Sequence, residues 1–326
     1  MKRCFWGIQG RCDYDGAVSS EAAKSEIRTP SVDIIIPAYN AAHYLPFAIE
    51  SVIAQTFEDW RMVLVDDGST DDTPSVVAPY RERLGARLLY IRQPNGGLPA
   101  ARNAAIRNSS AEFLALLDAD DVWLPNRLAD SMKSFEGRPE LGLSYGYISR
   151  IGPDGAVIDT FAKPQRNGEG RIATSIYTRA VYLPCPTITF RRKAVDEVGL
   201  FDETMRATED RDLWLRIAQK YEVALVPHLL AYYRTSPTSM TTDPERMLKA
   251  QIQFIEKHYG KEGCGWMARR RALSGIYKQT AEAFAERKLS RKALASSLRA
   301  LLYFPFSVSA LRTSGSLVIN SLGLRR

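Results

Sequence analysis

Residues 113–124 read FLALLDADDVWL, and this stretch decides the fold. Its first five residues are apolar, which predicts a strand buried on both faces. Three carboxylates follow within four positions, at Asp118, Asp120 and Asp121. Ligands of open α/β sheets bind beyond the carboxyl ends of the strands, and neighbouring carboxylates repel one another unless a positive charge lies among them. A divalent cation shared with substrate phosphates would supply that charge, so we predict a cation site here, with Asp121 capping the next helix.

The segment before this strand alternates between strand and helix. Short apolar or β-branched runs predict three strands, at Val32–Ile36, Trp60–Val65 and Arg87–Ile91. Helical spacing and helix-start residues predict helices at Tyr44–Gln55, from Asp71 onward and at Ala100–Arg107. A strand recurs roughly every 25–30 residues, as in βαβ units. We therefore expect an α/β fold with a mostly parallel sheet flanked by helices.

A second predicted strand, Trp60–Val65, also ends in carboxylates, at Asp66 and Asp67. The carboxyl ends of parallel strands lie at one edge of the sheet, so two acidic strand ends favour a binding site there.

The pattern changes after residue 135. A Pro153-Asp154-Gly155 turn between Leu141–Ile151 and Ala156–Thr160 predicts a hairpin. The prolines within Tyr182–Phe190 indicate an edge strand or a structured loop. Asp212–Gln219 and much of the chain from Pro244 to Leu301 have helical periodicity.

The net charge of +7 is concentrated near the C-terminus. Residues 241–326 contain 16 Lys and Arg but only 6 Asp and Glu. This asymmetry suggests an acidic partner such as anionic lipid or nucleic acid, although a solvated basic helical surface explains the charge equally well. The apolar stretch Ser297–Ile319 is interrupted by charged residues, proline and glycine, which favours an amphipathic element on a bilayer over a membrane span.

Cysteine and histidine usage argues against a zinc site. The four cysteines and three histidines are dispersed, without CxxC or mixed Cys/His spacing. This usage suits a reducing cytoplasm. Residues 1–30 lack the apolar core of a signal peptide, and we expect them to form a poorly ordered extension.

Five blocks of sequence, in order, resemble the family 2 glycosyltransferases with the GT-A (Rossmann-like) fold. The blocks are VDIIIPAYNAAHYLPFAIESVIAQTFEDWRMVLVDDGSTDDT (32–73), NGGLPAARNAAI (95–106), FLALLDADDVWLPNRL (113–128), VGLFDE (198–203) and TEDRDLWLRI (208–217). The resemblance covers roughly Ser31 to Pro237. It implies an inverting, Mn²⁺- or Mg²⁺-dependent transfer of a sugar from a nucleoside diphosphate donor.

The resemblance also implies roles for individual donor-side residues. The expected nucleotide-sugar-binding residues are Pro37, Tyr39, Asn40, Asp66, Asp67, Arg102 and Asp118. Among them, Asp67 matches the residue that hydrogen-bonds the base, which favours a UDP or dTDP donor. Asp118 and Asp120 match the DxD motif and would hold the metal.

On the acceptor side, Asp210 matches the catalytic base. A carboxylate within reach of an acceptor hydroxyl can take its proton as the new bond forms. Glu209 and Trp214 are further candidates for contact with the acceptor. The Q-x-x-R-W motif of processive members is absent, since the chain reads Arg211-Asp-Leu-Trp214 there, so we expect a non-processive enzyme.

Structural explanations compete with several of these roles. Asp66 could form the turn before Gly68, and Arg102 could simply pair with a carboxylate. Tyr39 could be a packing aromatic, and Trp214 could belong to the core. Glu209 and Asp210 could serve only the N-terminus of the helix that follows them.

The predicted organisation is an extension over residues 1–30, a glycosyltransferase domain over 31–240 and a basic helical region over 241–326. Residues 31–135 would bind the nucleotide and 136–240 the acceptor. The expected acceptor is a glycan or a lipid-linked glycan of cell-envelope or exopolysaccharide synthesis. The expected location is the cytoplasm, with the basic C-terminal region a candidate for contact with the inner face of the membrane; no nucleic acid partner is expected.

Two other functions remain open from the sequence. A nucleotidyltransferase would need a glycine- and lysine-rich loop after the first strand to hold a triphosphate, and Pro37–His43 contains no Gly, Lys or Arg. A non-catalytic basic module that binds membrane or nucleic acid would explain the charged C-terminal region, but not the two acidic strand ends.

Overall fold

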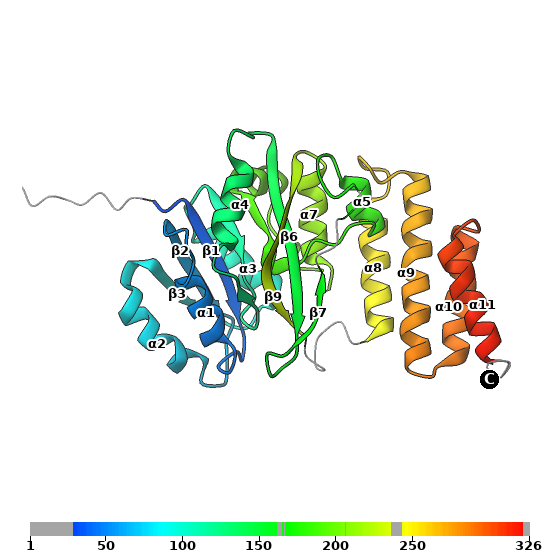
Figure 1. Ribbon diagram of the computed structural model, residues 1–326, viewed down its shortest axis with the longest axis horizontal. Helices are drawn as coiled ribbons and strands as arrows, with labels where there is room; N and C mark the ends of the chain where they lie inside the picture. Colours follow the sequence, from blue (N-terminus) through cyan, green and yellow to red (C-terminus); the bar gives the residue numbers. More distant parts are fainter. Residues whose placement is uncertain (1–28, 162–164, 166, 206, 236–242, 322–326) are drawn as a thin grey trace, which may run out of the picture.

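The computed structural model describes residues 29–161, 165, 167–205, 207–235 and 243–321. The predicted N-terminal extension lies outside this part of the chain except for its last two residues. Within the described residues, nine strands form one sheet covered by helices, and a row of further helices extends from one side (Figure 1).

The first half of the sheet is parallel, as predicted. The strands lie in the order β3-β2-β1-β4. Their bounds are β1 Val32–Ala38, β2 Trp60–Asp66, β3 Leu88–Arg92 and β4 Phe113–Leu116. The connecting helices are α1 Leu45–Ile53, α2 Thr73–Leu84 and α3 Leu98–Arg107.

The second half of the sheet is mixed. It continues in the order β8-β6-β9-β5, with β7 paired to β6 in the predicted hairpin. The strands are β5 Val122–Trp123, β6 Leu141–Ile151, β7 Val157–Phe161, β8 Thr189–Arg191 and β9 Glu222–Arg234. The helices are α4 Arg127–Phe135, α5 Ala173–Thr178, α6 Arg192–Val198 and α7 Glu209–Ala218.

Of the two alternatives predicted for Tyr182–Phe190, the structured loop holds as far as Ile188, and the segment ends in the strand β8, which is not an edge strand. It lies inside the sheet, antiparallel to both β4 and β6. The prolines are tolerated because they precede β8: Pro184 caps a short 3-10 helix, Cys185–Thr187, that contains Pro186. The strand β8 itself contains no proline, so each of its backbone nitrogens carries a hydrogen that can be donated within the sheet.

Alternate residues of the central strands pack against different helices. Ile35 of β1 belongs to a cluster with residues of α3, α5, α7 and α9. Its neighbours Ile34 and Ile36 belong to a second cluster with residues of α1 and α4. This alternation places an apolar layer on each face of the sheet, so the sheet is held rigidly and its edge can position a site.

The helical C-terminal region is confirmed. It consists of α8 Pro244–His258, α9 Trp266–Glu286, α10 Ser290–Tyr303 and α11 Val308–Ser321. These helices stand side by side, with α10 and α11 farthest from the sheet (Figure 1). None of the helices in the described part of the chain has the length and apolar character needed to cross a bilayer.

Candidate active site

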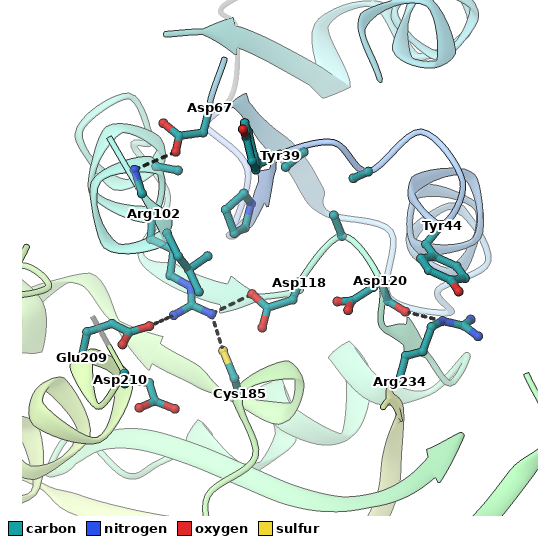
Figure 2. A pocket seen from close by; sticks show the side chains of 18 of the residues that line it. Tyr39, Tyr44, Asp67, Arg102, Asp118, Asp120, Cys185, Glu209, Asp210 and Arg234 are labelled. Atoms are coloured by element: carbon teal, nitrogen blue, oxygen red, sulfur yellow. Dashed lines mark hydrogen bonds and ion pairs between the residues drawn. The ribbon is translucent and has the colours of Figure 1, made fainter. Parts of the chain in front are cut away.

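A cavity of about 710 Å³ opens at the carboxyl ends of β1, β2 and β4. Residues from both halves of the sheet line it, together with Met247 of α8. Of the residues predicted from the sequence, its wall contains Pro37, Tyr39, Asn40, Asp67, Arg102, Asp118, Asp120, Glu209 and Asp210. Acidic side chains from three separate segments therefore meet at one hollow, and Figure 2 shows Asp67, Asp118, Asp120 and Asp210 around it.

Asp67 holds the turn before α3. Its Oδ1 accepts hydrogen bonds from Gly96 N at 2.9 Å and Gln93 Nε2 at 2.7 Å, and its Oδ2 accepts one from Gly97 N at 2.8 Å. Each carboxylate oxygen can accept two such bonds. In the described structure Oδ2 accepts one, so it can accept a second from a ligand. The buried carboxylate thus lies at the cavity with one acceptor position to offer a ligand N–H.

Asp66 does not line the cavity, and its predicted contact with the nucleotide is corrected here. Consecutive residues of a strand point to opposite faces, and Asp66 is fully buried. It accepts hydrogen bonds from Ser69 N and from the Tyr90 hydroxyl. Its role is to close the turn around Gly68, where φ is +76°.

Tyr39 and Asn40 follow β1 at the cavity wall. The Tyr39 side chain is 53% exposed and offers an aromatic face. Asn40 has a left-handed φ of +48°, which asparagine tolerates better than most residues. The Oδ1 of Asn40 accepts from Thr70 N and its backbone N–H donates to Ser69 Oγ, so it ties the β1 and β2 ends together.

The loop after β4 presents two carboxylates to the cavity, Asp118 and Asp120 (Figure 2). Burial, together with the negative charge of Asp118, raises the pKa of Asp120 to about 6. Burial and the neighbouring carboxylate thus disfavour the charged form of Asp120, and a cation beside the two carboxylates would favour it. The pair can therefore accept a cation.

The third carboxylate of the motif, Asp121, points away from the cavity. Its Oδ1 accepts a hydrogen bond from Arg234 N at 2.8 Å, and burial raises its pKa well above the ordinary value. The prediction that it caps the next helix is wrong, because α4 begins only at Arg127. Asp121 instead fixes the motif to the end of β9.

Arg102 joins three segments beneath the cavity. Its guanidinium is 2% exposed and contacts Asp118 at 2.7 Å, Glu209 at 3.3 Å and Cys185 Sγ at 3.1 Å (Figure 2). Burial opposes its charge, but the nearby carboxylates raise the pKa of Arg102 above its ordinary value. The predicted contact with the nucleotide remains a hypothesis, whereas the ion pairs with Asp118 and Glu209 are present.

Glu209 and Asp210 begin α7 and face different partners. Glu209 is turned toward Arg102, and burial with the adjacent Asp210 raises the pKa of Glu209. In the described structure Asp210 forms no ion pair; its Oδ1 accepts from Arg211 N at 2.6 Å. The Glu209 carboxylate is thus paired with the Arg102 guanidinium. The Asp210 carboxylate lies at the cavity wall and can act on a ligand.

The family model described as Glycosyl transferase family 2 matches residues 33–199, just over half of the chain. The chain belongs to glycosyltransferase family 2. This membership leaves the nucleotidyltransferase and the non-catalytic module without support.

Curated relatives agree with this assignment. An uncharacterized glycosyltransferase of Rickettsia prowazekii is 30% identical over 59% of this chain and 60% of its own length. The UDP-Glc:α-D-GlcNAc-diphosphoundecaprenol β-1,3-glucosyltransferase WfgD of Escherichia coli is 28% identical over 69% of this chain and 85% of its own. The chain spans less than two thirds of the length of the first three relatives.

Solved structures identify the fold as GT-A. The chain resembles S. aureus TarS in complex with UDP-GlcNAc, with a TM-score of 0.59, 17% identity and coverage of 90% and 92% of the two chains. It also resembles the mannosyltransferase PcManGT of Pyrobaculum calidifontis in complex with GDP-Man and Mn²⁺, with a TM-score of 0.61, 20% identity and coverage of 90% and 81%. The architecture predicted from the sequence, including the helical C-terminal region, is confirmed.

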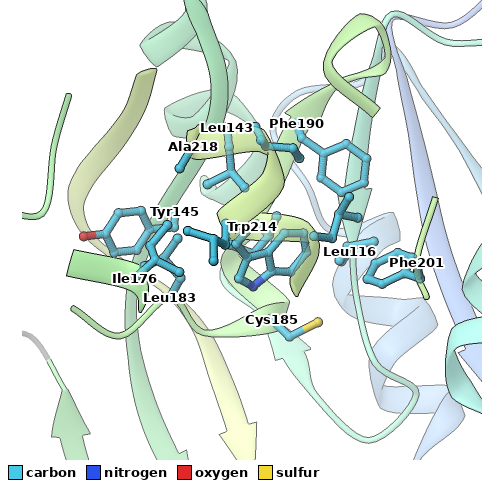
Figure 3. Packing of buried hydrophobic residues seen from close by; sticks show 14 of the residues in the cluster. Leu116, Leu143, Tyr145, Ile176, Leu183, Cys185, Phe190, Phe201, Trp214 and Ala218 are labelled. Atoms are coloured by element: carbon cyan, nitrogen blue, oxygen red, sulfur yellow. The ribbon is translucent and has the colours of Figure 1, made fainter. Parts of the chain in front are cut away.

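Trp214 lies in the core of this family 2 member and not at the cavity. It is 2% exposed and packs near Phe190 and Phe201 (Figure 3). Its predicted contact with the acceptor is therefore wrong. Trp214 is four residues beyond Asp210, so it lies about one helical turn farther along α7, on the face that packs against the sheet.

Cys185 and Arg234 are cavity residues that the sequence did not single out. Arg234 Nε donates to Asp120 O, its Nη1 donates to Gly152 O, and its guanidinium lies 4.4 Å from the centre of the Tyr44 ring. Arg234 could have been predicted from the sequence, because it is a charged residue at the end of a strand and ligands bind at that edge of the sheet. Nothing in the local pattern around Cys185 indicated its position.

The carboxylates at the cavity are compatible with binding of Mn²⁺ or Mg²⁺. In the described part of the chain, no group of three or more His, Cys, Asp or Glu is arranged to hold a metal ion. Magnesium is commonly bound by one or two carboxylates plus substrate phosphates. The two cavity carboxylates and the raised pKa of Asp120 fit that arrangement.

Proposed function

We propose that this protein is an inverting, metal-dependent, non-processive glycosyltransferase. It transfers a sugar from a nucleoside diphosphate donor, of the UDP or dTDP type, to a glycan or lipid-linked acceptor. The observation that carries the proposal is the meeting of Asp118 and Asp120 with Asp210 at one cavity.

The donor nucleoside binds against β1 and β2. The exposed ring of Tyr39 stacks on the base, and the free acceptor position of Asp67 Oδ2 receives a base N–H. Uracil and thymine both carry such a donor at N3. Pro37 and Asn40 complete this part of the wall.

The donor diphosphate lies over the loop that follows β4. Asp118 and Asp120 would hold Mn²⁺ or Mg²⁺, and the bound cation would supply Lewis-acid stabilisation of the departing diphosphate. Arg102 keeps Asp118 in place and holds Glu209 away from the reacting atoms. Arg234 fixes the main chain at Asp120.

Asp210 accepts the proton of the acceptor hydroxyl. The oxygen of the acceptor hydroxyl attacks the anomeric carbon of the donor sugar as the bond from that carbon to the diphosphate breaks. The hydroxyl proton passes to the Asp210 carboxylate. A single displacement of this kind inverts the anomeric centre and needs only one base.

The E. coli relative is named for a diphosphoundecaprenol-linked acceptor, which supports a lipid-linked acceptor and a place in cell-envelope polysaccharide synthesis. Such an acceptor would bring the protein to the cytoplasmic face of the membrane. Residues 31–135 would then supply the donor site and 136–240 much of the acceptor site.

A nucleotide-sugar screen tests the proposal. Purified protein is titrated with UDP-, dTDP- and GDP-sugars, with Mn²⁺ or with EDTA, and donor hydrolysis is followed. We expect one donor class to bind and to be hydrolysed slowly, only with metal. Failure of every donor to bind under both conditions would contradict the proposal.

A further inference from the structure

The last two helices form the outermost layer of the molecule. α10 and α11 lie beyond α9, on the side away from the sheet (Figure 1). Their contact with α9 includes a small cluster of Tyr277, Ala300 and Ala310. One side of this helical layer therefore packs against the protein and the other faces solvent.

The apolar residues of this layer are distributed in an unusual way. The buried positions of α10 carry only small side chains, namely Ala293, Ser296, Ser297 and Ala300. The exposed positions of α10, α11 and the turn between them include large apolar side chains: Leu298, Leu302, Phe306, Val308 and Leu311, which are 51–83% exposed. A water-facing helix surface is ordinarily polar, and apolar side chains grouped in this way mark an interaction site.

The charge of the same segment has one sign. Residues 287–326 contain eight Lys and Arg and no Asp or Glu. The exposed basic residues of the two helices are Arg291, Lys292, Arg299 and Arg312, of which Lys292 is paired with Glu245 of α8. We use the name outer face for Arg291, Arg299 and Arg312 together with the five exposed apolar residues.

These properties discriminate among partners. Nucleic acid would match the charge but would leave the five apolar side chains without a counterpart. A second copy of the chain, seated face to face, would bring like charges together. An anionic bilayer matches both, since it accepts apolar side chains at the acyl boundary and attracts Lys and Arg to its headgroups.

We propose that the outer face seats on an anionic lipid surface and holds the protein there as a peripheral membrane protein. Leu298, Leu302, Phe306, Val308 and Leu311 enter the boundary between headgroups and acyl chains, while Arg291, Arg299 and Arg312 contact anionic headgroups. This binding does not require transferase activity, so it stands apart from the proposed function.

Vesicle co-sedimentation of the full-length protein tests the inference. The vesicles contain phosphatidylcholine alone, or phosphatidylcholine with 30% phosphatidylglycerol. We expect binding to the anionic vesicles at least tenfold tighter than to the neutral ones, and weaker binding as salt increases. Leu302→Glu with Phe306→Glu should reduce binding at least tenfold, and Arg291→Gln with Arg312→Gln several-fold.

The control variant is Ile158→Glu on β7, a side chain of similar exposure, 58%, outside the C-terminal helices. It should bind vesicles as the unmodified protein does. Circular dichroism checks that each variant is folded, which we expect because the substituted side chains are exposed. Should a variant fail to fold, Leu298→Gln replaces it.

Three outcomes would overturn the inference. The first is equal affinity for neutral and anionic vesicles, or no binding to either. The second is an equal loss of binding in Ile158→Glu. The third is a dimer in light scattering that Leu302→Glu dissociates, without vesicle binding, since the outer face would then be an interface between copies.

Discussion

The proposed role of Asp210 as the base rests on the fact that Glu209, the carboxylate beside it, is already paired with Arg102. Glu209 pairs with the buried Arg102, whereas Asp210 forms no ion pair in the described structure. The sequence indicated both Glu209 and Asp210 but did not show which of the two would pair with a basic side chain. The distinction depends on a guanidinium that is 107 residues away from Glu209 in the chain.

Asp210→Asn should lower kcat by 10²–10⁴-fold. Asparagine keeps the size of the side chain but cannot take a proton, so the donor dissociation constant should stay within about twofold. Product formation measures kcat, and titration with the donor measures its dissociation constant. Asp130→Asn, at the surface contact with His228, serves as the control. Normal transfer by Asp210→Asn would mean that another group is the base.

Tyr39→Ala should weaken donor binding about tenfold. Stacking of a base on an aromatic ring is worth about 1–3 kcal/mol, and the exposed ring contributes little to folding. Phe47→Ala, at a similarly exposed position on α1 (57%), should leave the donor dissociation constant unchanged. Equal affinities of the Tyr39 and Phe47 variants would place the base elsewhere.

Arg102→Ala should lower the free energy of unfolding by about 3–5 kcal/mol, because the Asp118 and Glu209 carboxylates would lose a buried cation. Arg102→Lys should lower it by less, since a lysine is a single charge that cannot bridge both acids. Chemical denaturation measures both values.

The control for Arg102 is the exposed ion pair of Arg83 with Glu50. Surface pairs contribute about 0–1 kcal/mol, so Arg83→Ala should have little effect. Equal losses in the Arg83 and Arg102 variants would show that the buried bridge has no special stabilising role.

At the scale of elements, the strand and helix pattern of residues 32–135 was predictable, because periodicity is local information. The position of β8 was not. Its three residues pair with β4 and β6, which precede it by roughly 75 and 45 residues in the chain. Arg234 escaped prediction for a similar reason, since its contacts with Asp120 and Gly152 exist only once β9 lies beside β5 and β6.

The helix α7, which carries the proposed base, is anchored to α8 by a buried polar cluster. Asp212 is fully buried and accepts a hydrogen bond from His258 Nε2 at 2.8 Å. Lys257 contacts it at 2.6 Å and Arg216 at 2.8 Å. Burial opposes ionisation of Asp212, but these donors lower its pKa below the ordinary value. The C-terminal region thus supports the helix that carries the proposed base.

This cluster predicts a pH dependence of stability. Burial lowers the pKa of His258 below 6.5, although Asp212 opposes the shift. The unfolded state therefore binds a proton at a higher pH than the folded state, and stability falls as pH falls through 6.5. We expect His258 to account for part of the unfolding free energy that is lost between pH 7.5 and 5.5.

His258→Gln, which can still donate to Asp212, should remove that share of the slope. His228→Gln, at an exposed position, should leave it intact. Denaturant titrations at the two pH values measure the difference. An unchanged slope in His258→Gln would mean that folding does not shift the pKa of His258, and a steeper loss of stability would mean that folding raises it.

At the scale of the whole molecule, the cavity requires both halves of the sheet. Residues 37–120 contribute the wall proposed for the donor, and residues 182–247 contribute Asp210 and the opposite wall. The central claim is that acids from these distant segments form one site for a metal-bound donor diphosphate and a base.

One measurement tests this claim most directly: the shift in melting temperature on adding UDP, dTDP or GDP with Mn²⁺ to the unmodified protein, to Asp120→Asn and to Asp210→Asn. A ligand that binds only the folded state raises the melting temperature. We predict a Mn²⁺-dependent rise for one of the three nucleotides in the unmodified protein and in Asp210→Asn, and its loss in Asp120→Asn. An equal rise in all three proteins, with or without Mn²⁺, would contradict the account.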